Sequence, residues 1–244
     1  IRKVVIGQDA AIDLMLVSLL SDGHILMEGV PGTAKTLLAQ AFAHALSLDF
    51  GRIQFTPDLM PADVVGTTIV NEDESGQRVL VFQQGPVFAN IVLADEINRT
   101  SPKVQSAMLE AMGEKQVTVD NATYRLDKLF FVIATQNPLD LVGTYPLPTP
   151  QLDRFLFKIT MQHIEREAEL DVLDSYKSRR DPVAADKLQV ARTEVLKARE
   201  TIDQEVVIST AIKTALVDIS RNLRADERVL QGNSTRSMVL MRSE

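Results

Sequence analysis

The chain has 244 residues, of which 45% are hydrophobic and 24% are charged. These ordinary values exclude a disordered chain and a predominantly membrane-embedded one, and the length suits a medium domain with a smaller one. The net charge of −7 excludes a general attraction to nucleic acid or anionic membranes, and the lack of cysteine excludes disulfides and thiolate metal sites.

The first predicted element is a helix over residues 9–20, in which apolar side chains recur at helical spacing. Its apolar run is interrupted by Ser18 and preceded by Asp13, so it is well short of the ~20 residues that cross a bilayer. The sequence therefore predicts no transmembrane helix. Because the chain begins at Ile1 and not at methionine, we expect it to be part of a longer protein, with the cytoplasm as its default location.

A β–α–β unit is predicted next. The apolar segment 24–27 indicates a buried strand that ends at Gly29. Residues 37–46 then indicate a helix with a wide apolar stripe, and residues 52–55 indicate a second strand. A further helix is predicted over residues 102–112. Other segments are almost wholly apolar, as strands covered on both faces of a sheet are. They are residues 90–94, 129–134 and 155–159.

Strands and helices in alternation predict an α/β fold with a parallel sheet flanked by helices, which binds ligands at the carboxyl ends of its strands. Residues 66–82 and 116–126 depart from the alternation, because each has turn residues between β-prone segments, and both predict inserted hairpins. Beyond Ile164 only helical patterns remain. We therefore predict a domain boundary near residue 162, with a core over residues 1–162 and a smaller all-α domain over residues 163–244.

The segment Gly29 to Thr36, GVPGTAKT, follows a predicted strand and opens a predicted helix, as a phosphate-binding P-loop does. The N–H groups of such a loop converge on phosphate oxygens, Lys35 would reach the β- and γ-phosphates, and Thr36 would place its hydroxyl on Mg²⁺. The strict motif has glycine where this chain has Ala34. We expect alanine to be tolerated there, because a residue that enters the helix needs no positive φ, whereas Gly29 and Gly32 are harder to replace. An ordinary glycine-containing turn is the alternative.

Two carboxylates, Asp95 and Glu96, directly follow the apolar segment 90–94. Asp95 would hold Mg²⁺ through water and Glu96 would polarise the attacking water, which are the two roles that phosphoryl transfer needs. Adjacent carboxylates at the end of a strand are often only a solvated turn. Their occurrence together with a P-loop about 60 residues upstream favours a Mg²⁺-dependent ATPase.

Three polar residues further along the chain are weaker candidates. Asn137 follows the segment 129–134 and could orient the attacking water, although Asn-Pro also commonly opens a turn. Arg154 lies between a predicted short helix and the last strand, and Arg236 lies at the start of a late helix, but lone arginines are usually surface charges. The histidines are isolated and have no zinc-like spacing, so each is expected in the core or on the surface. They are His24, His44 and His163.

The motifs together resemble those of AAA+ ATPases, and specifically of the MoxR family. The resembling stretches are IGQ, GHILMEGVPGTAKT, RIQFTPDLMPADVVGT, QGPVFANIVLADEINRTSPKVQSAMLEAM, ATQNP, GTYPLP, QLDRFLF and GNSTR, which cover most of residues 4–160 and then thin out. The resemblance implies an AAA+ P-loop fold with a helical lid domain, here truncated at its C-terminus, and the cofactors ATP and Mg²⁺. It places Val5, Ile6 and Gly7 in the adenine pocket. The other residues expected to bind the nucleotide are Gly29, Pro31, Gly32, Thr33, Ala34, Lys35, Thr36 and Leu37.

The resemblance also assigns roles to the weaker candidates. Asn137 matches the sensor-1 position, and Arg236 matches the sensor-2 arginine of the lid, although the chain has GNSTR where the family usually has GASPR. Arg154 matches the arginine finger, which reaches the γ-phosphate of the neighbouring subunit. The resemblance therefore implies a homo-oligomeric ring, usually a hexamer, in which Arg99 is a second candidate for an intersubunit contact.

A protein-remodelling motor is the function that the resemblance implies. Such a chaperone-like ATPase would act on a protein partner, for example in metal-cofactor insertion or complex maturation. The two hairpins match the helix-2 insert and the pre-sensor hairpin of this clade, which face a partner or the ring pore.

Two alternatives are open. A nucleic-acid motor would need basic and aromatic residues in its hairpins, but residues 116–126 offer Tyr124 and Arg125 against Asp120, and residues 66–82 are net acidic. A nucleotide switch without turnover is the other alternative. It is disfavoured by the complete set of Lys35, Asp95 and Glu96.

Overall fold

The computed structural model describes residues 1–72, 75–138, 143–175, 189–229 and 234–235. Within these residues a five-stranded sheet has the order β2-β5-β8-β1-β9, and all of its neighbouring strands are parallel. The predicted strands are confirmed to within two residues at each end. They are β1 (Ile25–Glu28), β2 (Phe50–Gln54), β5 (Ile91–Asp95), β8 (Phe131–Gln136) and β9 (Phe157–Thr160).

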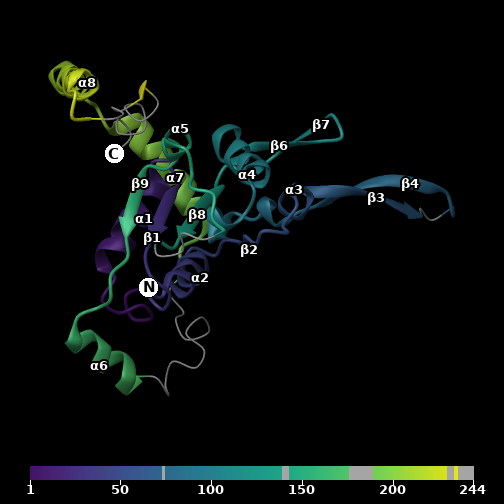
Figure 1. The fold of residues 1–244 in the computed structure, drawn as a ribbon, viewed down its shortest axis with the longest axis horizontal. Coiled ribbons are helices and arrows are strands. Elements are labelled where there is room, and N and C mark those ends of the chain that lie inside the picture. Colours follow the sequence, from purple (N-terminus) through teal and green to yellow (C-terminus); the bar gives the residue numbers. More distant parts are fainter. Residues whose placement is uncertain (73–74, 139–142, 176–188, 230–233, 236–244) are drawn as a thin grey trace.

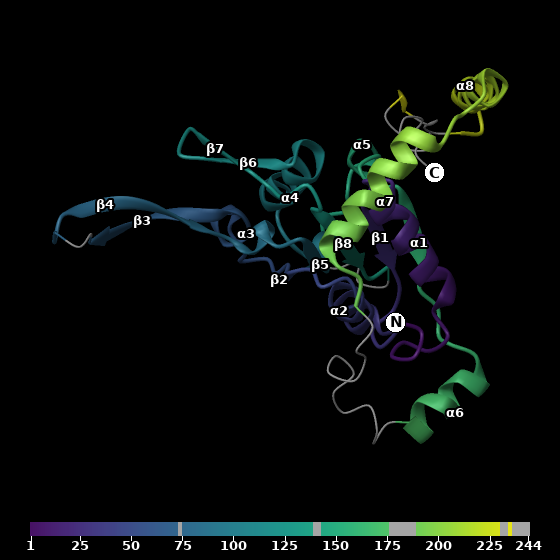
Figure 2. The same ribbon diagram turned by 180° about the vertical axis from the view of Figure 1, so that it is seen from behind.

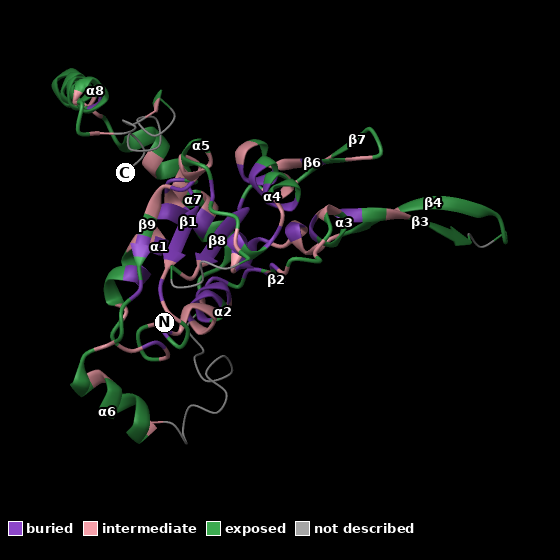
Figure 3. Cartoon of the chain, viewed as in Figure 1, coloured by how far each residue is buried: buried purple, intermediate pink, exposed green. Residues whose placement is uncertain are grey.

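Helices cover both faces of this sheet, which explains why its central strands are apolar up to their carboxyl ends (Figure 1). On one face the core includes side chains of α1 (Asp9–Leu20), α2 (Lys35–Ala45) and α7 (Arg192–Glu205). On the other face it includes side chains of α3 (Pro61–Val65) and α4 (Pro102–Glu114). Figure 3 shows the buried residues concentrated in the sheet and in these helices. Short helical segments connect the elements: η1 (Pro86–Phe88), η2 (Ile97–Arg99) and α5 (Thr149–Leu152).

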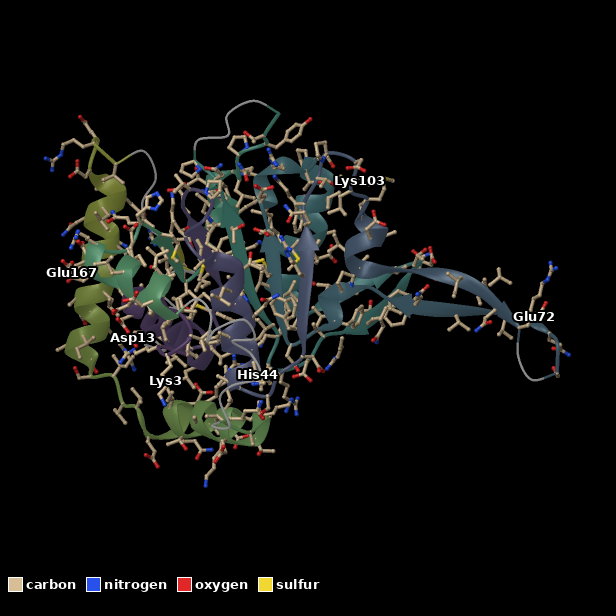
Figure 4. All side chains as sticks on the ribbon, turned by 90° about the horizontal axis from the view of Figure 1, so that it is seen from below. Lys3, Asp13, His44, Glu72, Lys103 and Glu167 are labelled. Atoms are coloured by element: carbon tan, nitrogen blue, oxygen red, sulfur yellow. The ribbon has the colours of Figure 1, made fainter. Side chains whose placement is uncertain are left out.

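The predicted hairpins project from the same side of the body (Figure 1). The longer one pairs β3 (Gly66–Glu72) with β4 (Arg78–Gln84), and Figure 4 places Glu72 near its outer end. The shorter one pairs β6 (Gln116–Val119) with β7 (Ala122–Arg125). Its turn residues have left-handed φ angles, as a tight hairpin turn requires. Phe82 of β4 stacks on Tyr124 of β7 with ring centroids 3.9 Å apart, so the two hairpins are in contact near the body.

The C-terminal part is helical, as predicted, with α6 (Arg166–Ser175), α7 and α8 (Thr210–Ala225). Figure 2 shows α7 along the body beside α1, whereas α6 and α8 lie away from it. Val195 of α7 is buried in the core, and Arg199 donates to the carbonyl oxygen of Leu19 at 2.7 Å and to Asp22 at 2.7 Å. The helix α7 therefore packs on the core, and the domain boundary near residue 162 stays a prediction. The predicted loop at 179–182 lies outside the described residues.

The helices of the described residues are too short or too polar to cross a membrane. This agrees with the prediction made from residues 9–20, whose helix α1 has 12 residues and is packed into the core.

Candidate functional site

The predicted P-loop lies between β1 and α2, at the carboxyl edge of the sheet. Gly29 has no room for a side chain, because a Cβ atom there would lie 2.5 Å from the carbonyl oxygen of Met161. Gly32 has a φ of +86°, which strains any other residue. Both glycines are thus as hard to replace as the sequence predicted, for two different reasons.

The expectation that Ala34 needs no positive φ was wrong. This residue is the N-cap of α2 and has not entered the helix, and its φ of 62° and ψ of 20° are left-handed. The loop must turn at this point to present its N–H groups before the helix begins, and this turn favours glycine. Alanine in the left-handed region costs roughly 1–2 kcal/mol. The chain therefore carries backbone strain at the residue before Lys35.

Ala34→Gly should raise the free energy of unfolding by up to about 1 kcal/mol. The relief of strain exceeds the roughly 0.4–1 kcal/mol that glycine costs through the entropy of the unfolded chain. Urea denaturation measures the effect, with Ala107→Gly in the middle of α4 as a control, which should lose about 1 kcal/mol because its backbone is helical. A loss of stability of similar size in both variants would contradict a strained Ala34.

Lys35 folds back over the loop that precedes it. Its Nζ donates to the carbonyl oxygens of Gly29 and Val30, both at 2.8 Å. Burial lowers the pKa of Lys35, and the nearby carboxylates of Asp95 and Glu96 oppose this shift. A bound phosphate would add a further negative charge that favours the ammonium form. The arrangement is that of a partly buried cation that is held by carbonyl dipoles and suited to an anion.

Asp95 and Glu96 lie at the carboxyl end of β5, and Thr135 of β8 joins them. The Thr135 hydroxyl donates to Asp95 Oδ1 at 2.7 Å and accepts the backbone N–H of Glu96 at 2.9 Å. Asp95 Oδ2 accepts from Arg52 Nη2 of β2 at 2.7 Å. Sequence reasoning missed both Thr135 and Arg52. A polar threonine at the end of an apolar run, two residues before Asn137, is the signal that could have identified the first.

The Glu96 side chain points toward the edge strand β2. Its Oε2 accepts from Gln54 Nε2 at 2.9 Å and from Arg99 Nη1 at 3.0 Å. The backbone of Glu96 is left-handed, with a φ of 58°, so the chain turns sharply where the carboxylate leaves the strand. Arg99, the second candidate for an intersubunit contact, therefore pairs with a carboxylate of its own chain.

A cavity of about 420 Å³ brings most of the predicted phosphate and metal residues together. The P-loop from Gly29 to Leu37 lines it from one side, and Asp95, Glu96 and Asn137 line it from the other. Thr36 and Asp95 thus face the same cavity. Mg²⁺ usually keeps several waters and binds through one or two protein ligands together with substrate phosphates. The hydroxyl of Thr36 and the carboxylate of Asp95 are therefore enough protein ligands for this ion. The described residues hold no cluster of three or more histidine, aspartate or glutamate side chains that would suit a metal bound by protein alone.

A second cavity, of about 640 Å³, adjoins the first across Gly32 and Leu37. Val5 and Ile6 line it together with apolar side chains of α6, which suits a flat aromatic base. Gly7 is not among the lining residues. Its φ is +73°, and a Cβ atom there would lie 2.7 Å from the side chain of Ile164. The lack of a side chain at Gly7 therefore lets the N-terminal segment pack against Ile164 in the wall of this cavity.

Arg154 lies at the opposite edge of the sheet from the cavity. It precedes β9, whose first residue, Phe157, pairs with Ile25 at the amino end of β1, whereas Gly29 follows the carboxyl end. Its Nη1 donates to the carbonyl oxygen of Leu109 in α4. The arginine is thus outside the phosphate cavity of its own subunit. Arg236, the other predicted arginine, lies outside the described residues.

Comparisons with known proteins agree with this geometry. The model of the ATPase family associated with various cellular activities (AAA) matches residues 24–157. YeaC of Bacillus subtilis is 45% identical over all of this chain, which spans 75% of YeaC. The chaperone MoxR1 of Mycobacterium tuberculosis is 43% identical over 89% of this chain and 55% of its own length. MoxR of Methylorubrum extorquens is 36% identical over 66% of this chain and 47% of its own length. The chain thus spans about half the length of the last two relatives.

A crystal structure of a candidate ATPase from Cytophaga hutchinsonii has the same fold, with a TM-score of 0.86 and 42% identity. The match covers 99% of this chain and 74% of that one. The family match, the relatives and the five-stranded parallel sheet agree with the resemblance of the motifs. The chain belongs to the AAA+ ATPases and, within them, to the MoxR family.

Proposed function

We propose that the chain binds ATP with Mg²⁺ and hydrolyses it in a ring of identical subunits, to remodel a protein partner. The observation that carries this proposal is the cavity that is lined jointly by the P-loop, Asp95, Glu96 and Asn137. The adjoining apolar cavity suits the base of the nucleotide. We also propose a cytoplasmic location, where ATP is the abundant substrate.

Different residues of the cavity would bind the phosphates, hold Mg²⁺ and accept the proton of the attacking water. The phosphates would replace the carbonyl oxygens that Lys35 contacts, and the loop N–H groups would bind the phosphate oxygens. Thr36 and Asp95 would hold Mg²⁺, which neutralises charge on the phosphates when it is bound. Glu96 would turn from Gln54 toward the cavity and take a proton from water.

The reaction is then a hydrolysis at the γ-phosphate. The water oxygen forms a bond to the γ-phosphorus, the bond from this phosphorus to the β,γ-bridging oxygen breaks, and ADP and phosphate leave. Glu96 accepts the proton, and Asn137, which lines the same cavity, would orient the water with its amide.

Arg154 would complete the site of the next subunit. It lies at the amino edge of the sheet and contacts α4, so its guanidinium is directed away from the cavity that its own P-loop lines. A ring in which this edge meets the cavity of a neighbour, most simply a hexamer, would bring Arg154 to the γ-phosphate. There it would neutralise charge that develops in the transition state.

A protein client is favoured by the exposed apolar side chains of the β3–β4 hairpin. Val70 is 62% exposed and Leu80 is 75% exposed, and they lie opposite each other in the register. Apolar surface of this kind marks contacts with proteins more often than contacts with nucleic acid. The name of the relative MoxR1 describes a chaperone. Metal-cofactor insertion or complex maturation is the kind of work that we propose for such a motor.

The direct test is steady-state ATP hydrolysis with Mg²⁺ and with an excess of EDTA. We expect turnover with Mg²⁺ and its loss with EDTA, and full activity in EDTA would contradict the proposal. For the client, we expect the Glu96→Gln variant to hold ATP and to retain a protein in a pull-down. Lys35→Ala, which should not bind ATP, is the matched control. Equal recovery of the same proteins by both variants would contradict a nucleotide-dependent client.

A further inference from the structure

Arg154 lies against the last turns of α4 in its own subunit. Its Nη1 donates to the carbonyl oxygen of Leu109, which is near the carboxyl end of this helix. The carboxyl end of a helix carries partial negative charge, which favours a guanidinium there. The position of Arg154 is therefore set by its contact with α4. The segment that holds this arginine, between α5 and β9, is short and irregular.

Gly113 of α4 provides the space in which this guanidinium lies. A Cβ atom at residue 113 would be 2.0 Å from Arg154 Nη1 and 3.1 Å from its Cζ. The first separation is far below a van der Waals contact and the second is tight, so the guanidinium in this position and a side chain at residue 113 exclude each other. The backbone of Gly113 is helical and has no positive φ, so the conformation itself does not require glycine. What requires glycine is the guanidinium.

His24 holds α4 and the segment after Arg154 in fixed relation. Its Nδ1 accepts the N–H of Val132, so its Nε2 carries the proton and donates to the carbonyl oxygen of Met112 at 3.2 Å. Its own carbonyl oxygen accepts the N–H of Leu156 at 2.7 Å. The ring is buried between Phe130 and Phe131. Met112, one residue before Gly113, and Leu156, two residues after Arg154, are thus both bound by His24, the first by its ring and the second by its backbone carbonyl.

We infer that Gly113 is a positioning residue for Arg154, because its missing side chain lets the guanidinium lie against α4 in the orientation in which it reaches the neighbouring subunit. This inference rests on the proposed role of Arg154 as an arginine finger. Gly113 does not line the phosphate cavity of its own subunit, and it would not touch ATP. It would affect turnover only through the arginine.

Gly113→Ala tests this inference with the change of one methyl group. The guanidinium is the end of a flexible side chain, so it should move aside and the protein should still fold. Alanine is the better helix former, so the midpoint of urea unfolding should not fall. We expect kcat in the assembled protein to fall by about 10- to 100-fold, as misplaced groups do, with KM for ATP unchanged. The control is Ser106→Ala, which adds no volume on the exposed side of the same helix.

Mixing of variants distinguishes this inference from a failure of the proposed finger. Lys35→Ala subunits have a damaged P-loop and an intact Arg154, so they should restore turnover when they are mixed with Gly113→Ala subunits. Arg154→Ala subunits should not. The mixture of Lys35→Ala with Arg154→Ala is the reference. If this reference mixture shows no recovery, the finger itself is wrong. Two results would overturn the inference about Gly113 when the reference mixture does recover turnover. One is a normal kcat for Gly113→Ala alone, and the other is a mixture of Gly113→Ala with Lys35→Ala that does not recover turnover.

Discussion

Glu96→Gln is expected to lower ATP turnover by about 10²- to 10⁴-fold, which is the contribution of a general base. The amide keeps the size of the side chain and can still accept from Gln54 and Arg99, so the local structure should persist. It cannot take the proton of the attacking water. The affinity for ATP should therefore remain, because the P-loop, Thr36 and Asp95 are unchanged. Single-turnover hydrolysis and nucleotide binding, measured on the same preparation, separate the two effects.

A matched control for this variant is Glu110→Gln, which makes the same chemical change at an exposed position of α4. Its turnover should equal that of the unmodified chain. Hydrolysis by Glu96→Gln at the unmodified rate would remove Glu96 from the role of base. The role of Glu96 would then be structural, through its contacts with Gln54 of β2 and Arg99 of η2.

Arg154→Ala is expected to lower turnover in the assembled protein by about 10³-fold or more, which is the effect of arginine fingers in comparable phosphoryl-transfer enzymes. The loss should appear in kcat, whereas ATP binding by separate subunits should persist, because Arg154 lies at the far edge of the sheet from its own P-loop. Turnover and nucleotide affinity at several protein concentrations measure both quantities.

Arg166→Ala removes an arginine that is 79% exposed and is the control for loss of positive charge. It should leave kcat unchanged. Normal hydrolysis by Arg154→Ala in the assembled state would contradict the finger. Loss of ATP affinity in separate Arg154→Ala subunits would also contradict it, because the arginine would then serve its own site.

The sequence predicted the sheet well because its signals are local. Residues 91–94 of β5 and 131–134 of β8 are all apolar and buried, and Gly29 and Lys35 lie where a strand meets a helix. The phosphate and metal residues could therefore be assigned from the P-loop motif and the paired carboxylates together with their places after predicted strands, since the carboxyl ends of parallel strands meet at one edge.

Contacts that depend on strand register could not be predicted in this way. Thr135 reaches Asp95 because β8 lies beside β5, and Arg52 reaches it because β2 lies at the edge next to β5. The strand order that creates these contacts is not a property of either segment. The left-handed Ala34 was missed for a related reason, since the start of α2 is decided by the turn of the P-loop and not by helix propensity.

The long-range packing of α7 was likewise missed. Its apolar stripe was assigned to the separate helical domain, but Val195 lies in the core, and Arg192 donates to Asp127 at 2.8 Å. Burial and this contact have opposite effects on the carboxylate, and the pKa of Asp127 is lowered because hydrogen bonds from Arg192 and Leu129 outweigh desolvation. A helical stripe shows that a face is buried, but it does not show which surface buries it.

The most direct test of the composite site is ATP turnover in mixtures of Lys35→Ala and Arg154→Ala subunits over a range of ratios. Each variant alone lacks one half of every site. If Arg154 completes the site of a neighbour, the mixtures will hydrolyse ATP faster than either variant alone, with a maximum at intermediate ratios, because some sites then combine an intact Lys35 with an intact Arg154. Turnover that only follows the weighted sum of the two variants would show that no site is shared, and it would contradict the account.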